Sequence, residues 1–150
     1  KLYGVVSNMS IAMERRDLLQ KFDCFICNQQ EAGMFFSDDY SEKNQEELQE
    51  ILAGCLKKGN IPSMVVTMGG KGSVYADCDG LRGFCPPKNV SVKDTTGAGD
   101  SFCAGVASGL TYGKTLPEAV EIGTRLAASV ITSSENVCPR FLPAEFGLEV

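Results

Sequence analysis

The chain has 150 residues, of which 43% are hydrophobic and 22% charged, and its formal net charge is −5. This composition is typical of one globular domain that can bury a core, and the negative charge disfavours a nucleic-acid partner. No apolar run approaches the roughly 18 residues of a membrane-spanning helix, and no signal peptide opens the sequence, so we expect no membrane partner.

Seven cysteines lie mostly within apolar segments, and the chain has no histidine. Cys24 and Cys27 have the spacing of half a zinc ribbon, but a second pair is missing. We therefore interpret the cysteines as free thiols of a reducing, cytoplasmic environment. Without histidine, a catalytic base would have to be Asp, Glu, Lys, Tyr or Cys.

The first half of the chain predicts strands and helices in alternation. The clearest helix covers 39–58, where apolar residues recur at helical spacing between Leu48 and Leu56. We expect Asp39 and Glu42 to form its capping box and Gly59 to end it. The other expected elements are a strand over 2–7, a helix over 8–21, a buried strand over 22–27 and a short helix beginning within 31–36.

The second half begins with a predicted strand over 61–68, which stops at a glycine-rich loop. Asp79-Gly80 is a typical hairpin turn between strands 73–76 and 81–85. Thr115 and Glu118 form a capping box, which predicts a helix from there to about 133. The remaining expectations are a strand over 90–92, a helix over 99–112 whose small residues allow close packing, and a final turn within 144–149.

The alternation predicts an α/β fold with a mostly parallel sheet, flanked by helices in Rossmann-like layers and extended by a small β-hairpin. No repeat or linker divides the chain, so we expect one domain over 1–150. In such sheets, ligands bind beyond the carboxyl ends of the strands. Polar or glycine-rich segments follow three predicted strands and could meet at that edge: 28–31, 69–72 and 95–100.

The strongest functional signal is the stretch Asp94-Thr-Thr-Gly-Ala-Gly-Asp100. It leads a glycine-rich turn into a helix, whose first N–H groups and dipole attract an anion. A carboxylate at this place is useful if it takes a proton from the group that attacks the anion. The stretch is not a Walker loop, and Phe102 stands where a dinucleotide fingerprint needs its third glycine. From the residues alone, a phosphate loop with a base and an ordinary glycine-rich helix start both remain open.

The same stretch, continued through Ser-Phe-x-Ala-Gly, resembles the second signature of the ribokinase-like (PfkB) carbohydrate kinase family nearly letter for letter. Asn28-x-x-Glu31 resembles the Asn-x-x-Glu motif of that family, and Thr67-Met-Gly-Gly-Lys-Gly72 resembles its strand-end loop before the signature. With Phe141-Leu-Pro143 near the end, the resemblance covers nearly the whole chain. It implies a ribokinase-like fold.

The resemblance implies a kinase that transfers the γ-phosphate of ATP to an alcohol group of a sugar or nucleoside. Asp100 would be the general base for the attacking hydroxyl. The N–H groups of Gly97, Ala98 and Gly99 would form the anion hole for the transferring phosphoryl group. The alternative for Asp100 is an ordinary acidic residue in the first turn of a helix.

The resemblance also implies sites for the nucleotide and for cations. Asn28 and Glu31 would organise Mg²⁺ and its waters, although a strand-end cap is the alternative for both. Asp94 and Thr96 would hold a monovalent cation such as K⁺, or form a turn. The residues expected to border the nucleotide are Thr67, Gly69, Gly70, Gly72, Thr96 and Asn136.

The segment 127–139 would wall the adenine site, and Ser133–Pro139 is similar to the end of the last helix in pseudouridine-kinase-like members. Cys138 replaces the asparagine of that pattern, which weakens this hint of a subfamily.

A complete kinase of this kind would be about twice this length, and its first half supplies the sugar-binding residues and a lid. We therefore expect this chain to be the nucleotide-binding, catalytic C-terminal part of a larger enzyme, with the N-terminal substrate and lid part absent and little activity alone. The strand over 2–7 would leave an apolar edge prone to self-association, for example as a homodimer. The alternative is a non-catalytic nucleotide-binding module. A dinucleotide-binding oxidoreductase is disfavoured by Phe102, and the identity of the acceptor does not follow from these residues.

Overall fold

A computed structural model describes residues 1–134 and 142–148, and the chain comprises two compact units, Lys1–Pro86 and Pro87–Val150. The described part of the first unit contains a five-stranded sheet in the order β1-β2-β3-β4-β5. The strands β1 (Tyr3–Val5), β2 (Cys24–Asn28) and β3 (Ser63–Thr67) run parallel. The strands β4 (Ser73–Asp77) and β5 (Arg82–Cys85) add the expected antiparallel hairpin. The predicted α/β class with a mixed, mostly parallel sheet is confirmed.

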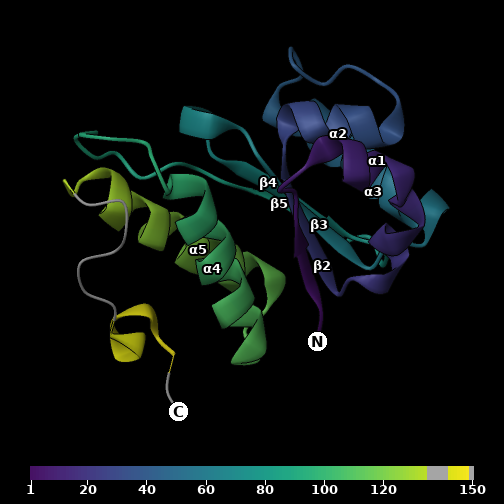
Figure 1. Cartoon of the computed structure of the whole chain (residues 1–150). Helices are drawn as coiled ribbons and strands as arrows, with labels where there is room; N and C mark the ends of the chain where they lie inside the picture. The colour runs from purple at the N-terminus through teal and green to yellow at the C-terminus, as the bar shows by residue number, and fades with distance from the viewer. Residues whose placement is uncertain (135–141, 149–150) are drawn as a thin grey trace. The chain divides into compact units, whose positions relative to one another are not determined.

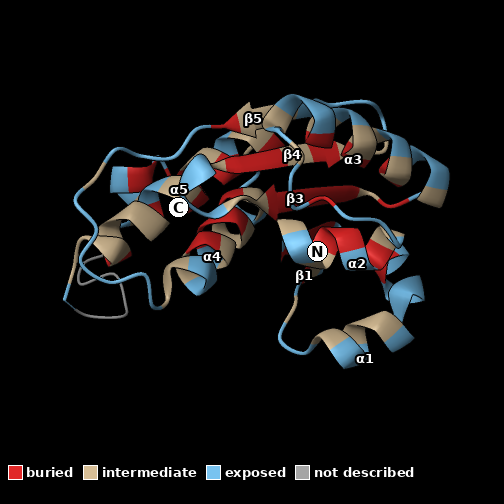
Figure 2. Cartoon of the chain, turned by 90° about the horizontal axis from the view of Figure 1, so that it is seen from above, coloured by how far each residue is buried: buried red, intermediate tan, exposed pale blue. Residues whose placement is uncertain are grey.

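Three helices belong to this unit: α1 (Met9–Glu14), α2 (Gln29–Phe36) and α3 (Gln45–Gly59). Helices α2 and α3 lie against one face of the sheet (Figure 1) because alternate strand residues on that face are apolar. Figure 2 shows β3 and β4 largely buried and the outer side of α3 exposed. The core between them is built from Phe25, Cys27, Met64, Val66, Val74, Leu48, Leu52 and Leu56.

Two helix predictions in this unit are wrong in their limits. The helix expected over 8–21 ends at Glu14, because Arg15 leaves the helical conformation at φ −123° and ψ 44°, and a 3₁₀ segment follows over Arg16–Lys21. The helix expected from residue 39 begins six residues later, at Gln45. Its capping box is formed by Asn44 and Glu47, not by Asp39 and Glu42.

The end of α3 also differs from the expectation. Gly59 is the last helical residue, and Asn60 takes the left-handed conformation that closes the helix, with φ 49°. Asparagine tolerates this conformation better than other residues that carry a side chain. The residue that stops the helix is therefore the neighbour of the one that the sequence indicates.

The described part of the second unit contains α4 (Ala98–Thr111), α5 (Leu116–Ile131) and a 3₁₀ turn over Pro143–Phe146. The two helices pack closely through small residues: a Cβ added to Gly105 would lie 2.6 Å from the Cα of Gly123. The capping box of Thr115 and Glu118 is present as predicted. The strand expected over 90–92 is wrong, because among the described residues this segment pairs with no other strand. The N–H group of the next residue, Lys93, donates to the Ile131 carbonyl at 2.8 Å.

Candidate active site

Two of the predicted site segments lie side by side at the carboxyl end of the parallel strands. Asn28 ends β2 and Thr67 ends β3, and the two residues are direct neighbours in the register of this strand pair. Helix α2 begins after the first strand and the loop Gly69–Gly72 follows the second. The first unit therefore brings the segments around Asn28 and Thr67 to one edge of the sheet.

Asn28 and Glu31 hold each other in a capping box at the start of α2. The side-chain oxygen of Asn28 accepts the N–H of Glu31, and the carboxylate of Glu31 accepts the N–H of Asn28, each at 2.8 Å. The structural alternative for this pair is thus present in the molecule. It does not consume the carboxylate, which offers about four lone-pair sites and uses one of them here.

The donor set fits magnesium only in part. The described residues contain no group of three or more His, Cys, Asp or Glu side chains close enough to hold a metal ion. One amide and one carboxylate fit an ion that keeps most of its waters and arrives with phosphate groups. Asn28 and Glu31 are therefore suited to contact the water shell of such an ion rather than to enclose it.

The loop Gly69–Gly72 is a closed turn whose glycines are required by its shape. The N–H of Met68 donates to the Gly72 carbonyl at 2.8 Å, which closes the turn. Gly72 has φ 104°, and a Cβ there would lie 2.4 Å from the Cys85 carbonyl oxygen. Gly69 and Gly70 are exposed, with open space where a side chain would stand. A ligand can therefore approach the backbone of this turn closely.

The second unit contains the other predicted segment, residues 94–100, at the start of α4. Gly97 precedes the helix in the left-handed conformation, with φ 79°. Among the described residues no side chain caps this helix, whereas α2, α3 and α5 each begin with a capping box. Within this turn the N–H of Ala98 donates to the Thr95 carbonyl at 3.2 Å, so the N–H groups suited to water or an anion are those of Gly99 and Asp100.

The carboxylate of Asp100 belongs to the same first turn of α4, and the residue is exposed. The arrangement therefore combines a helix N-terminus that favours negative charge with a carboxylate able to accept a proton. An anion bound at this turn and a hydroxyl that attacks it would both be near that carboxylate.

Asp94 forms the turn that leads into this segment. Its carboxylate accepts the N–H of Thr96 at 2.9 Å, and this hydrogen bond lowers the pKa of Asp94 below its ordinary value. The side chain is exposed and ionised at neutral pH. This geometry is the turn alternative for Asp94, and a bound monovalent cation is not needed to explain it.

Asn136 and Cys138 lie outside the described residues, as does the part 135–139 of the segment that would wall the adenine site. The six described cysteines form no disulfide with one another. Burial raises the pKa of Cys24 to about 11, so this thiol stays protonated near neutral pH and is inert. Cys24 and Cys27 stand on opposite faces of β2, because they are three positions apart and successive side chains alternate between the faces.

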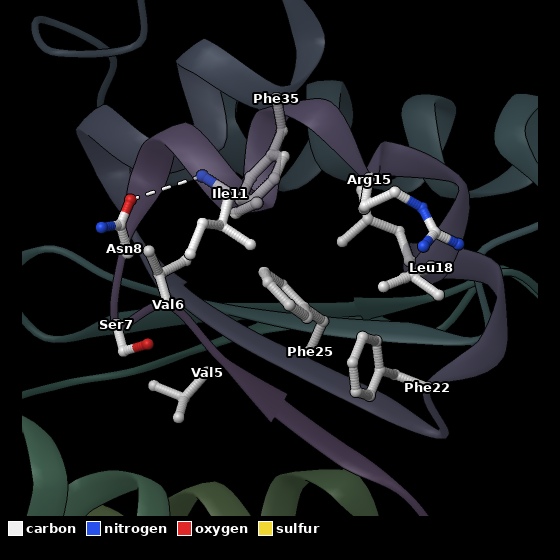
Figure 3. A pocket seen from close by; sticks show the side chains of 12 residues that line it. Val5, Val6, Ser7, Asn8, Ile11, Arg15, Leu18, Phe22, Phe25 and Phe35 are labelled. Carbon is white, nitrogen blue, oxygen red and sulfur yellow. Dashed lines mark hydrogen bonds between the residues drawn. The ribbon is translucent and has the colours of Figure 1, made fainter.

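A cavity of about 190 Å³ lies beside β1 and α1 (Figure 3), and residues of the predicted site segments do not line it. Its walls are mainly apolar and include Val6, Ile11, Phe22 and Phe25. Asn8 is a polar residue at its rim, but its side chain caps α1 by accepting the N–H of Ile11 at 3.3 Å. A sugar or nucleoside needs several convergent polar groups, so this cavity is not a good candidate for acceptor binding.

Known proteins resemble this chain in sequence. Residues 4–139 match the model of the pfkB family of carbohydrate kinases. The guanosine-inosine kinase of Exiguobacterium acetylicum is 41% identical over 145 residues, which are 95% of this chain and 47% of that protein. The pseudouridine kinase of Escherichia coli strain K12 is 34% identical over 76 residues, or 51% of this chain and 25% of that one.

The fold also matches solved structures. An Arabidopsis thaliana ribokinase, determined with ribose and ATP, superposes with a TM-score of 0.76 at 23% identity, covering 89% of this chain and 42% of that one. The chain thus spans about half the length of the first of these relatives and of this structure. None of the helices in the described part of the chain combines the length and apolarity that crossing a membrane requires.

Proposed function

Since the chain belongs to the pfkB family of carbohydrate kinases, we propose that it is the nucleotide-binding, catalytic part of an ATP-dependent phosphotransferase. The acceptor is an alcohol group of a sugar or nucleoside. The γ-phosphoryl group moves from ATP to the hydroxyl oxygen, the hydroxyl proton goes to Asp100, and ADP leaves.

The start of α4 is the observation that carries this proposal. A left-handed glycine, a helix without a side-chain cap among the described residues and a first-turn carboxylate occur together there. The N–H groups of Gly97, Ala98 and Gly99 stabilise the charge on the transferring phosphoryl group, and Asp100 is the general base. Positioning and electrostatic stabilisation of this kind account for most of the catalysis of phosphoryl transfer.

The residues at the sheet edge take the other parts of the site. The turn Gly69–Gly72, together with Thr67, borders the nucleotide, and the family resemblance implies the same role for Thr96 and Asn136. Asn28 and Glu31 would orient the waters of a Mg²⁺ ion, which would supply positive charge to offset that of the phosphates. A monovalent cation such as K⁺ near Asp94 belongs to the same proposal.

For the acceptor, the likeness to a guanosine-inosine kinase favours a purine nucleoside over a free sugar. The test mixes Mg-ATP with guanosine, inosine, pseudouridine and ribose and measures ADP release. It compares the 150-residue chain with the longest natural chain that contains it. We expect turnover by the longer chain and little by the shorter one, because the acceptor-binding residues belong to the remaining part.

The second candidate is a non-catalytic nucleotide-binding module, favoured by the chain's covering only 47% of its relative. ATP binding without phosphorylation of any acceptor by either chain would select that candidate. The absence of both binding and phosphorylation would contradict the two candidates together. Self-association through β1 and a cytoplasmic location are further parts of the proposal, and analytical ultracentrifugation tests the first of them.

A further inference from the structure

Ser73 carries a buried hydroxyl without a partner. The residue is 2% exposed, and among the described residues its oxygen is the one buried side-chain polar atom that makes no hydrogen bond. Burying a hydroxyl in this state is unfavourable, and in native proteins such groups usually mark a place where a water or a ligand completes the structure.

Ser63, also in this sheet, shows the usual arrangement. It is the first residue of β3, whose last residue, Thr67, pairs with Ser73, and it is also buried, at 9% exposure. Its hydroxyl donates to the carbonyl oxygen of Asp23 at 2.7 Å. The lack of a partner is therefore a feature of the place that Ser73 occupies and not of buried serines in this sheet.

That place is the edge of the proposed nucleotide site. Ser73 is the first residue of β4 and directly follows Gly72, the last glycine of the turn. In the antiparallel register it stands opposite Thr67, and Thr67 stands beside Asn28 in the parallel register. Residues directly opposite each other point to the same face of a sheet. Asn28, Thr67 and Ser73 therefore form one polar row across the end of three strands.

The adjoining turn is closed by the hydrogen bond from the Met68 N–H to the Gly72 carbonyl, and its two outer glycines make no packing contacts where a side chain would stand. Gly69 and Gly70 are exposed, and neither has a neighbour within contact distance of the place where a side chain would stand. The Ser73 oxygen is out of contact with solvent in the present arrangement. A nucleotide bound against the turn would reach this oxygen after a shift of these glycines.

We propose that Ser73 is a nucleotide-binding residue, whose hydroxyl donates a hydrogen bond to an oxygen of the nucleoside triphosphate when the Gly69–Gly72 turn moves. The inference rests on the proposed function. Without nucleotide, the hydroxyl is an unfavourable buried group. With nucleotide, it gains the partner that it lacks, so its stabilising effect belongs to the complex alone.

The test uses the longest natural chain that contains this sequence, with Ser73→Ala and the matched control Ser63→Ala. Unfolding in urea without nucleotide and the dissociation constant for a non-hydrolysable Mg-ATP analogue, by calorimetry, are measured for both. We expect Ser73→Ala to be at least as stable as the wild type and to bind the analogue about 3- to 10-fold more weakly. Ser63→Ala should be less stable and bind normally.

The outcomes separate this inference from the proposed function. If the wild type does not bind the analogue, the proposed function fails and this inference fails with it. If the wild type binds and Ser73→Ala binds equally well, this inference alone is overturned, and a loss of stability would then assign the hydroxyl to a structural water. Should Ser73→Ala not fold, Ser73→Cys keeps the shape with a weaker donor. Unchanged affinity in that variant overturns the inference, and weaker binding supports it.

Discussion

Gly99→Ala separates the two interpretations of the α4 start, because it should change stability and activity in opposite directions. Gly99 lies in the first turn of α4, and a Cβ there meets no atom within 4 Å. Alanine is favoured over glycine in a helix by about 0.5–1 kcal/mol, so the variant should be more stable by up to that amount. The same methyl group stands beside the N–H groups proposed to hold the phosphoryl group.

A displacement of about 1 Å in the reacting group can cost on the order of 100-fold in rate, so we expect kcat to fall by about 10- to 100-fold. The assays are urea unfolding and steady-state ADP release by the longest natural chain that contains this sequence. Gly54→Ala is the matched control, since Gly54 lies in α3, is exposed and also has open space around its Cβ position. A more stable Gly99→Ala with wild-type kcat would refute the anion-hole assignment and leave an ordinary helix start.

Two further predictions concern the second unit. Gly105→Ala should destabilise this unit by about 1–3 kcal/mol, because the new Cβ would lie 2.6 Å from the Cα of Gly123. Chemical denaturation measures the free energy of unfolding, and an unchanged value would contradict the close packing of α4 on α5. The hydrogen bonds from Thr115 lower the pKa of Glu118 below its ordinary value of 4.5. Their stabilising contribution is therefore present above the pKa that Glu118 has in the unfolded chain, and it is lost as the pH falls through the lower pKa of the folded chain. Glu118→Gln should therefore flatten this part of the acid dependence of the unfolding free energy, and an unaltered profile would argue against the capping box.

Local patterns predicted the elements better than their limits. The apolar stripe from Leu48 to Leu56 correctly indicated α3, but the predicted capping box of Asp39 and Glu42 is not the one that begins it. The box of Asn44 and Glu47 forms because it is the one next to the stripe, where the helix gains burial. Tertiary packing, which the sequence does not display, decides at which capping residue the helix begins.

The segment 90–92 shows a strand that local preference predicted and the structure does not form. Its valines have a high preference for strands, but a strand exists only beside another strand, and the described residues offer it none. The turn at Gly97 could be predicted, because two glycines one residue apart at the start of an apolar helix indicate a backbone that only glycine adopts readily.

Ser73 could not be singled out from the sequence. Its identity and its position after Gly72 are unremarkable, and only burial without a partner distinguishes it. That property depends on the strands on both sides of it. The Asn28 and Glu31 pair was found from its resemblance to a family motif, with a strand-end cap as the alternative, and the structure shows the two residues bonded to each other as a capping box.

The central claim is that Asp100 accepts the proton of the attacking hydroxyl. The most direct test is the kcat of Asp100→Asn, which keeps the shape of the side chain and removes its basicity, in the longest natural chain with Mg-ATP and its best acceptor. The account predicts a fall of about 10²- to 10⁴-fold with nucleotide affinity near that of the wild type. A folded variant with wild-type kcat would contradict it.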